Sequence, residues 1–429
     1  MMLNYIILSL GQIVSFIGSQ LSSFALGVWV YQRTKTATQF TLISFLFALA
    51  DILFSPISGW VVDNYDRRRV MILNDIGAAF FAMILVGLLI TQNLSFWNLG
   101  LIVSINGALG SLRGPAFTAS TTLMLPKKHL IRANGILTMA FSMGGIVAPT
   151  LAGILINAMG INGVLIVDIF TFVFSIGTLL IVHIPNAAKL SNENYSDKMF
   201  LSLIGERLLG MKYVIQHRGL IILLIYFMIQ SFITFTTLVL LVPMLLSLSD
   251  PKILGRILSA AAGGGILGGL VMAIWGPRKR MWAILGFGIF QEVLMVFTGS
   301  MVNPLFIGIG FFLFFLGAPI VAGCDTVIWQ CKIPPEIQGR VFGARRIITM
   351  GSVPIGYLIA GPLADYIFEP MMMPNGALAG TVGKIIGVGK GRGIGLMFVL
   401  GGIILMIITT IAFFIPRLRN LEDEIPDVI

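Results

Sequence analysis

GWVVDNYDRRR, at residues 59–69, closes a long apolar run with a dense group of charges. About 210 positions later, GGL at 268–270 followed by GPRKR at 276–280 closes another apolar run in a similar way. A second pair of landmarks repeats at nearly the same offset, PKK at 126–128 and PP at 334–335. Two landmarks that share one offset indicate that the chain consists of two related halves.

The composition places both halves in a membrane. Hydrophobic residues make up 57% of the 429 residues, and charged residues only 11%. Soluble domains carry about 25% charged residues, so a water-soluble globule is excluded. Apolar runs of about 20 residues or more cross a hydrocarbon core of about 30 Å as helices, because a helix satisfies its backbone hydrogen bonds within one segment.

Twelve such runs are present, and one polar break divides them into six and six. The predicted fold is therefore all-α: a polytopic membrane protein with 12 transmembrane helices in two pseudo-symmetric six-helix bundles. We expect an N-terminal bundle at 1–185, an amphipathic cytoplasmic connector at 186–218, a C-terminal bundle at 219–416 and a cytoplasmic tail at 417–429. The runs lie near residues 3–32, 38–62, 70–92, 96–125, 135–158, 161–184, 219–247, 254–275, 282–300, 303–331, 342–367 and 394–415.

Basic residues set the expected orientation. With both termini in the cytoplasm, most of the 28 Lys and Arg residues fall in cytoplasmic segments, as the positive-inside rule requires. The net charge of +10 then reflects this topology and contact with anionic lipid headgroups. It does not indicate nucleic-acid binding, because the charges lie in short separate loops. We expect a multi-pass protein of the plasma (inner) membrane.

The first landmark resembles the signature between helices 2 and 3 of the major facilitator superfamily. Asn64 and Asp66 depart from it, standing where that family usually has a basic residue and a glycine. The resemblance implies a cytoplasmic latch between the two halves, in which the motif aspartate faces the positive end of a helix, an arrangement worth about 0.3–1 kcal/mol. The alternative is that the arginines only anchor the topology. The matching residues are Gly59, Asp63, Arg67, Arg68 and Arg69.

A second motif, in the run near 135–158, resembles the exporter signature of the same superfamily. Small residues at its spacing allow close helix packing, and its proline removes a backbone donor and bends the helix. Generic small-residue packing is the simpler interpretation. GRVF at 339–342 and GPLAD at 361–365 add a resemblance to the macrolide-efflux and siderophore-export branch of drug:proton antiporters. The motif residues are Gly135, Gly144, Ala148, Pro149, Ala152 and Gly153.

Charged residues inside the apolar runs are the candidates for proton coupling and substrate contact. An ionisable group at bilayer depth costs at least about 2.5–3.5 kcal/mol on insertion scales, so each should face protein or water. Asp51 and Arg113 lie at matching depths, roughly 18 and 20 Å from the inner side. We expect them to pair, so that protonation of Asp51 frees Arg113 for cargo. A static ion pair that holds the first bundle together is an equal alternative.

The second half offers Asp325 and Glu292 as further coupling candidates. A carboxylate that faces lipid would instead be protonated and silent. Structural hydrogen bonding is the expected role of the two other acidic residues at depth, Asp75 and Asp168.

GVGKGRG at 387–393 superficially resembles a phosphate cradle. It lacks the Gly-x4-Gly-Lys-Ser/Thr spacing and the preceding strand that such a cradle needs, and the expected topology places it outside the cytoplasm. We therefore expect no nucleotide, no cofactor and no metal site.

The sequence predicts a secondary active efflux transporter that exports amphipathic compounds (macrolide-, peptide- or siderophore-like) by alternating access, in exchange for protons. Its expected partners are a small amphipathic substrate, protons and the lipid bilayer. A lipid or lysolipid flippase, or an importer of the same fold, is the alternative. A membrane enzyme is disfavoured because the sequence has no His, Cys or carboxylate cluster at catalytic spacing.

Overall fold

The computed structural model describes residues 2–125, 127–184, 213–424 and 426. Over these residues the regular secondary structure is entirely helical, which confirms the all-α class. Among the described residues, ten helical segments are long and apolar enough to cross a membrane. They are Asn4–Thr34, Ala37–Val62, Arg67–Ile90, Ala158–Ile181, Arg218–Leu248, Lys252–Trp275, Arg280–Ser300, Pro304–Lys332, Val341–Met372 and Arg392–Phe414.

Two of the twelve predicted spans are not among these ten. The span at 96–125 forms a helix of sufficient length, α4 (Phe96–Met124). The span at 135–158 lies in the first part of α5 (Lys127–Ile181), where most side chains are outside the described residues. The full count of twelve therefore stays a prediction.

The helices belong to two compact units, each described by itself. The first comprises Met1–Lys189 and Ser249–Ala262, and the second Leu190–Leu248 and Gly263–Ile429. Residues 186–212 of the predicted connector lie outside the described residues.

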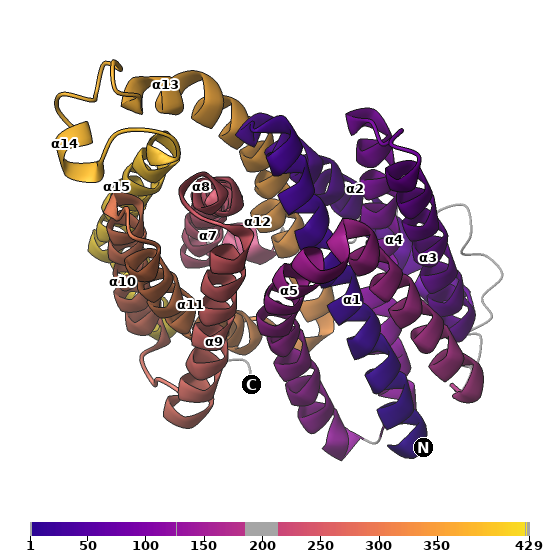
Figure 1. The fold of residues 1–429 in the computed structure, drawn as a ribbon. Helices are drawn as coiled ribbons and strands as arrows, with labels where there is room; N and C mark the ends of the chain where they lie inside the picture. Colours follow the sequence, from indigo (N-terminus) through magenta and orange to yellow (C-terminus); the bar gives the residue numbers. More distant parts are fainter. Residues whose placement is uncertain (1, 126, 185–212, 425, 427–429) are drawn as a thin grey trace. The chain divides into compact units, whose positions relative to one another are not determined.

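In the first unit, α1 packs mainly against α5, α2 against α4, and α3 against both α4 and α5. These helices run from indigo to magenta in Figure 1. The long helix α5 breaks at Gly160, whose φ of 69° favours glycine, so it contains two predicted spans. The remaining bounds are α1 Met2–Thr34, α2 Ala37–Asn64 and α3 Arg67–Ile90.

In the second unit, α10 packs against α11 and α15, and α7 packs against α12. The span 219–247 is divided into α7 and α8 because Pro243 lacks an N–H and its ring crowds the carbonyl four residues earlier. The helix α9 (Pro251–Trp275) belongs to the second unit only from Gly263 onward. The other bounds are α7 Arg218–Leu238, α8 Leu241–Leu248, α10 Arg280–Ser300, α11 Pro304–Lys332, α12 Pro335–Leu363, η1 Ala364–Phe368, α13 Glu369–Met372, α14 Gly383–Ile386, α15 Arg392–Phe414, α16 Pro416–Arg419 and α17 Leu421–Glu424.

Two glycines one turn apart bring α9 close to α11. A Cβ on Gly264 would lie 2.0 Å from the carbonyl oxygen of Phe312, and one on Gly268 would lie 2.0 Å from that of Leu316. Only glycine permits this approach, which is how small residues strengthen helix contacts in lipid.

The described part of the predicted tail at 417–429 is docked on the second unit. Glu422 accepts a hydrogen bond from the backbone N–H of Met281 at 2.9 Å, and its carbonyl accepts one from Lys332 Nζ at 2.6 Å. Leu418 and Leu421 are fully buried. The start of α10, the end of α11 and the tail therefore lie at the same end of this unit.

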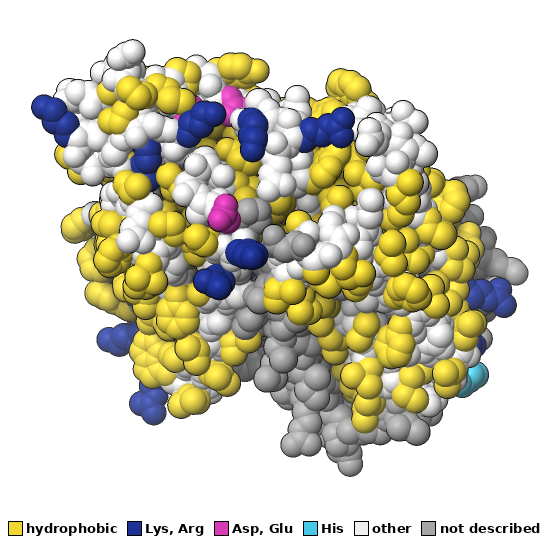
Figure 2. Space-filling view, in the orientation of Figure 1, with side chains coloured by type: hydrophobic (Ala, Val, Ile, Leu, Met, Phe, Trp, Pro, Cys, Tyr) yellow, Lys and Arg dark blue, Asp and Glu magenta, His cyan; other side chains and the backbone are white. Residues whose placement is uncertain are grey.

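Figure 2 shows that hydrophobic side chains make up much of the visible surface and that charged side chains are few and scattered. An exposed surface of this kind is stable in lipid, where exposed apolar side chains carry no cost.

Candidate functional site

The intramembrane arginine of the first unit is paired with a carboxylate. Arg113 on α4 donates from Nη2 to Asp75 Oδ1 on α3 at 3.2 Å and to Ser15 Oγ on α1 at 2.9 Å. The side chain of Asp75 is 1% exposed and that of Arg113 is 18% exposed. At 1.5 Å per residue, the two lie about 12 Å from the start of α3 and about 17 Å from the end of α4. Both residues therefore lie well inside their helices, Asp75 closer to the start of α3 and Arg113 closer to the end of α4.

The second oxygen of Asp75 is also engaged. Its Oδ2 accepts from Ser175 Oγ on α5 at 2.7 Å and from Gln12 Nε2 on α1 at 3.3 Å, and Gln12 also donates to Ser175 at 2.9 Å. Four helices thus meet at one carboxylate. Gln12 Oε1 and Arg113 Nε are buried without a hydrogen-bond partner among the described residues, so the cluster retains capacity for a water, a proton or a polar group of a ligand.

The ion pair described for Arg113 is with Asp75 and not with Asp51, the expected partner. Asp51 is half-buried on α2 and is not without a partner of its own, so its role in coupling stays a prediction. Depth along a helix does not settle which carboxylate reaches Arg113, because several helices pass it at the same level and the rotation of each helix also matters. Asp75 was predicted to have a structural role, and it is the centre of this cluster.

Asp168 follows the expected pattern of structural hydrogen bonding. It is 4% exposed, and its Oδ1 accepts from Thr171 Oγ1 at 3.3 Å, one turn further along the same helix.

In the second unit, Glu292 on α10 is 1% exposed and faces protein. It accepts hydrogen bonds from Gln230 Nε2 on α7, at 2.9 Å, and from Thr409 on α15. Tyr226 joins the cluster through Thr409 and Gln230, each at 3.1 Å. Glu292 Oε2 has no hydrogen-bond partner among the described residues. Sequence reasoning identified Glu292 and missed Tyr226 and Thr409, which carry no charge to mark them.

Asp325 on α11 pairs with Arg345 on α12. Trp329 donates its indole N–H to the other carboxylate oxygen at 2.9 Å. The guanidinium also lies over the rings of Trp329 and Phe342, with centroids 5.1 and 5.9 Å away, which adds cation–π attraction. Both carboxylate oxygens of Asp325 thus have a partner.

The charged loop before α3 is organised by Asp66. Its side chain accepts from the backbone N–H groups of Arg68 at 2.8 Å and Arg69 at 3.4 Å, which makes it the N-cap of α3. Aspartate in place of the family's glycine is therefore an N-cap. Gly59 lies near the end of α2, and the side chain of Asp63 is outside the described residues, so its latch role stays a prediction.

The neighbouring arginines bind backbone carbonyls of other helices. Arg67 donates to the carbonyl of Ala119 at 2.9 Å, and Arg68 donates to that of Leu179 at 2.7 Å. Leu179 lies in the last turn of α5, where carbonyls lack intrahelical partners and a cation is favourable, whereas Ala119 lies five residues before the end of α4. These contacts fasten α3 to α4 and α5 within the first unit.

The described residues of the exporter motif are packed. Ala148 and Ala152 are 0% exposed and share a cluster with Leu21, Ala25 and Val164. Gly153 is also buried. The surroundings of Gly135, Gly144 and Pro149 lie outside the described residues, so the motif stays a prediction.

The Gly-rich segment forms the end of the second unit near α15. Gly387, Gly389 and Gly391 have φ values of 98°, 119° and 82°, which only glycine adopts easily. Arg392 is 2% exposed and donates to the carbonyls of Gly299 and Met301, both at 2.8 Å.

Glu369 completes this loop. Its carboxylate accepts from the backbone N–H groups of Gly391 at 3.1 Å and Ile394 at 3.2 Å. Glu369 therefore caps the start of α15, and the N–H group of Gly391 is used within the protein.

The many apolar helices and the buried charge clusters define a multi-pass membrane transport protein. The family model described as Major Facilitator Superfamily matches residues 8–357. The chain belongs to the major facilitator superfamily.

Curated relatives match along most of the chain. It is 28% identical over 367 residues to macrolide efflux protein A of Streptococcus pyogenes, covering 83% of this chain and 88% of that protein. It is 23% identical over 408 residues to the multidrug efflux pump Tap of Mycolicibacterium fortuitum, covering 92% and 91%.

Solved structures share the fold at low identity. The nucleoside transporter NupG superposes with a TM-score of 0.70 at 12% identity, over 96% of this chain and 99% of that one. A bacterial homologue of the human drug peptide transporters PepT1 and PepT2 gives 0.68 at 14%, over 97% and 99%.

Proposed function

We propose that this protein exports small amphipathic compounds, macrolide-like in the first place and peptide- or siderophore-like as further classes, across the plasma membrane in exchange for protons. Transport proceeds by alternating access of the two bundles predicted from the duplicated sequence, with both termini in the cytoplasm. The chain acts as a transporter and not as an enzyme.

The observation that carries this proposal is the Asp75–Arg113 pair at the meeting point of α1, α3, α4 and α5. A proton-coupled transporter needs a group that accepts a proton inside the membrane. A charge at that depth is energetically costly, so a buried ionisable residue there is a candidate for this role. When Asp75 takes up a proton, its attraction for Arg113 falls. For exchange, a polar group of the cargo occupies the cluster while Asp75 is ionised, at the unpartnered Gln12 Oε1 or Arg113 Nε, and the proton binds Asp75 after the cargo has left.

Two other carboxylates are ranked behind Asp75. Glu292 has one unpartnered oxygen in a cluster of neutral donors. A proton can bind this oxygen without breaking an ion pair, so Glu292 is the second candidate. Asp325 is held by Arg345 and Trp329, which suits a fixed structural pair better. Asp51 is retained as a candidate because of its depth on α2.

The direction of transport and the cargo class are supported by the relatives, which are named as macrolide and multidrug efflux proteins. The apolar character of the chain, with 31 Phe and 22 Met residues, suits a bulky amphipathic cargo, because Met accommodates varied shapes.

The test is the accumulation of a radiolabelled macrolide in cells that express the protein. Expressing cells should hold less macrolide than vector controls, and a protonophore should abolish the difference. Asp75→Asn should also abolish net export. Lysophospholipid and nucleoside serve as comparison cargoes; movement of lysophospholipid with no effect on macrolide would replace export by the flippase alternative.

A further inference from the structure

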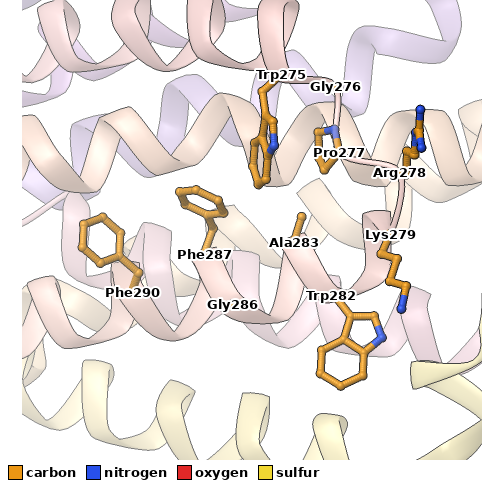
Figure 3. A pocket seen from close by; sticks show the side chains of 10 residues that line it. All are labelled: Trp275, Gly276, Pro277, Arg278, Lys279, Trp282, Ala283, Gly286, Phe287 and Phe290. Atoms are coloured by element: carbon orange, nitrogen blue, oxygen red, sulfur yellow. The ribbon is translucent and has the colours of Figure 1, made fainter.

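A groove of about 730 Å³ runs between the end of α9 and the start of α10, within the second unit. Figure 3 shows Phe287 and Phe290 pointing from α10 toward α9, with Trp275 opposite them. Arg278 and Lys279 lie at the end of the groove, in the loop that joins the two helices. One end of the groove is thus basic and the rest is apolar.

The apolar side follows from helical spacing. Ala283, Gly286, Phe287 and Phe290 lie three to four residues apart on α10, so they share one face. A Cβ on Gly286 would meet nothing within 4 Å, which means that glycine leaves the middle of the groove open. Trp275 and Phe290 are 54% and 38% exposed, so the apolar wall is unfilled.

The length of the groove matches one leaflet. Lys279 and Phe290 are separated along α10 by about 16 Å at 1.5 Å per residue. Half of a hydrocarbon core of about 30 Å is about 15 Å. A headgroup at Lys279 would therefore place its acyl chain along the groove as far as Phe290.

The charge of the groove selects the headgroup. Arg278 and Lys279 are exposed and have no ion-pair partner among the described residues. Arg280, the next residue, pairs with Glu422 at 3.6 Å, so it is already neutralised. The docked tail and the basic loop share one end of this unit, which the positive-inside rule assigns to the cytoplasm, and the cytoplasmic leaflet carries the anionic lipids.

We propose that this groove binds one anionic phospholipid of the cytoplasmic leaflet, with its phosphate between Arg278 and Lys279 and an acyl chain against Phe287 and Phe290. Trp275 lies at the level where an indole ring suits the boundary between headgroups and chains. The bound lipid fills the groove between α9 and α10. Its binding does not depend on which cargo the protein exports.

The first experiment compares lipid binding by native mass spectrometry, with phosphatidylglycerol and phosphatidylcholine added in equal amounts. The wild-type protein should retain phosphatidylglycerol preferentially. Each basic residue near an anionic headgroup strengthens binding by about fivefold, so Arg278→Gln with Lys279→Gln should lower this preference by roughly 25-fold. Lys384→Gln with Lys390→Gln removes the same charge from two exposed lysines, one on α14 and one in the Gly-rich segment, and should leave the preference unchanged.

The second variant, Gly286→Leu, fills the groove without a change of charge, and the open space around this glycine allows it to fold. It should lower retention of both lipids. Quenching of tryptophan fluorescence by phosphatidylglycerol with brominated acyl chains should fall in the same variant, and unfolding temperature without added lipid should stay at the wild-type value.

Three results would overturn the proposal. The basic-loop variant would keep the full preference for phosphatidylglycerol, the control variant would lose it equally, or Gly286→Leu would retain lipid as the wild type does. A groove that seats a second copy of the chain would instead yield a dimer that Gly286→Leu dissociates.

Discussion

Asp75→Asn should destabilise the first unit by about 3 kcal/mol, because removing one partner of a buried ion pair leaves the other charge uncompensated at a cost of about 3–5 kcal/mol. The lower end applies here, since the Arg113 side chain keeps 18% exposure and a second acceptor in Ser15. Arg113→Gln should cost a similar amount. The double variant should be less destabilised than the two single effects added together, with a coupling energy of about 1–3 kcal/mol.

The assay is equilibrium unfolding by SDS in mixed micelles, followed by helicity, for the wild type, both single variants and the double variant. A second cycle with Asp51→Asn and Arg113→Gln tests the pair expected from the sequence. A coupling energy below about 0.5 kcal/mol for Asp75 with Arg113, within the range of independent sites, would refute the reasoning. Stronger coupling of Asp51 than of Asp75 to Arg113 would return the pair to Asp51.

Four further substitutions, one of them with a matched control, test other parts of the chain. Asp66→Ala removes the N-cap of α3 and should lower the free energy of unfolding by about 1 kcal/mol in the same assay. An unchanged free energy of unfolding would contradict the capping role. Gly268→Val places a side chain where a Cβ already meets a backbone oxygen at 2.0 Å, so the yield of folded protein should fall, whereas Gly269→Ala, whose Cβ meets nothing within 4 Å, should not lower it. Asp63→Asn should slow transport in inserted, folded protein, and wild-type rates would remove the latch hypothesis. Pro149→Leu should reduce export at normal expression; unchanged export would reduce the exporter motif to generic packing.

The fold class was predictable because lipid permits so few solutions. Long apolar runs must be helices, and ten of the predicted spans are confirmed among the described residues. Helix ends were less predictable. Pro243 divides one predicted span into two helices. After α12, the helical backbone continues through η1 and α13 to Met372, beyond the predicted end at 367. These details depend on local backbone geometry, which hydropathy does not record.

The sequence identified individual charged residues of the candidate site, but it did not identify their partners. A charge within an apolar run is conspicuous, so Arg113, Glu292 and Asp325 were all identified. Their partners were not, because pairing depends on how each helix is rotated about its axis. Neutral partners such as Ser175 were missed altogether, because a serine in a transmembrane helix is common and carries no charge.

The end of the second unit illustrates the same limit. Glu422 lies in the predicted cytoplasmic tail at 417–429, and its carboxylate binds the start of α10. Glu369 similarly caps the start of α15 from outside that helix. In both cases a carboxylate satisfies exposed N–H groups at a helix start, and the sequence distance between the partners hides the relation.

Proton exchange is most directly tested by the luminal pH of proteoliposomes that contain the purified protein and a trapped pH-sensitive dye. With an acidic lumen, macrolide added at the cytoplasmic face should accelerate the rise of luminal pH in wild-type vesicles. Asp75→Asn should abolish this response while exchange of labelled for unlabelled macrolide, which needs no net proton movement, continues. Macrolide transport by the wild type with no change in luminal pH would contradict the proposed exchange.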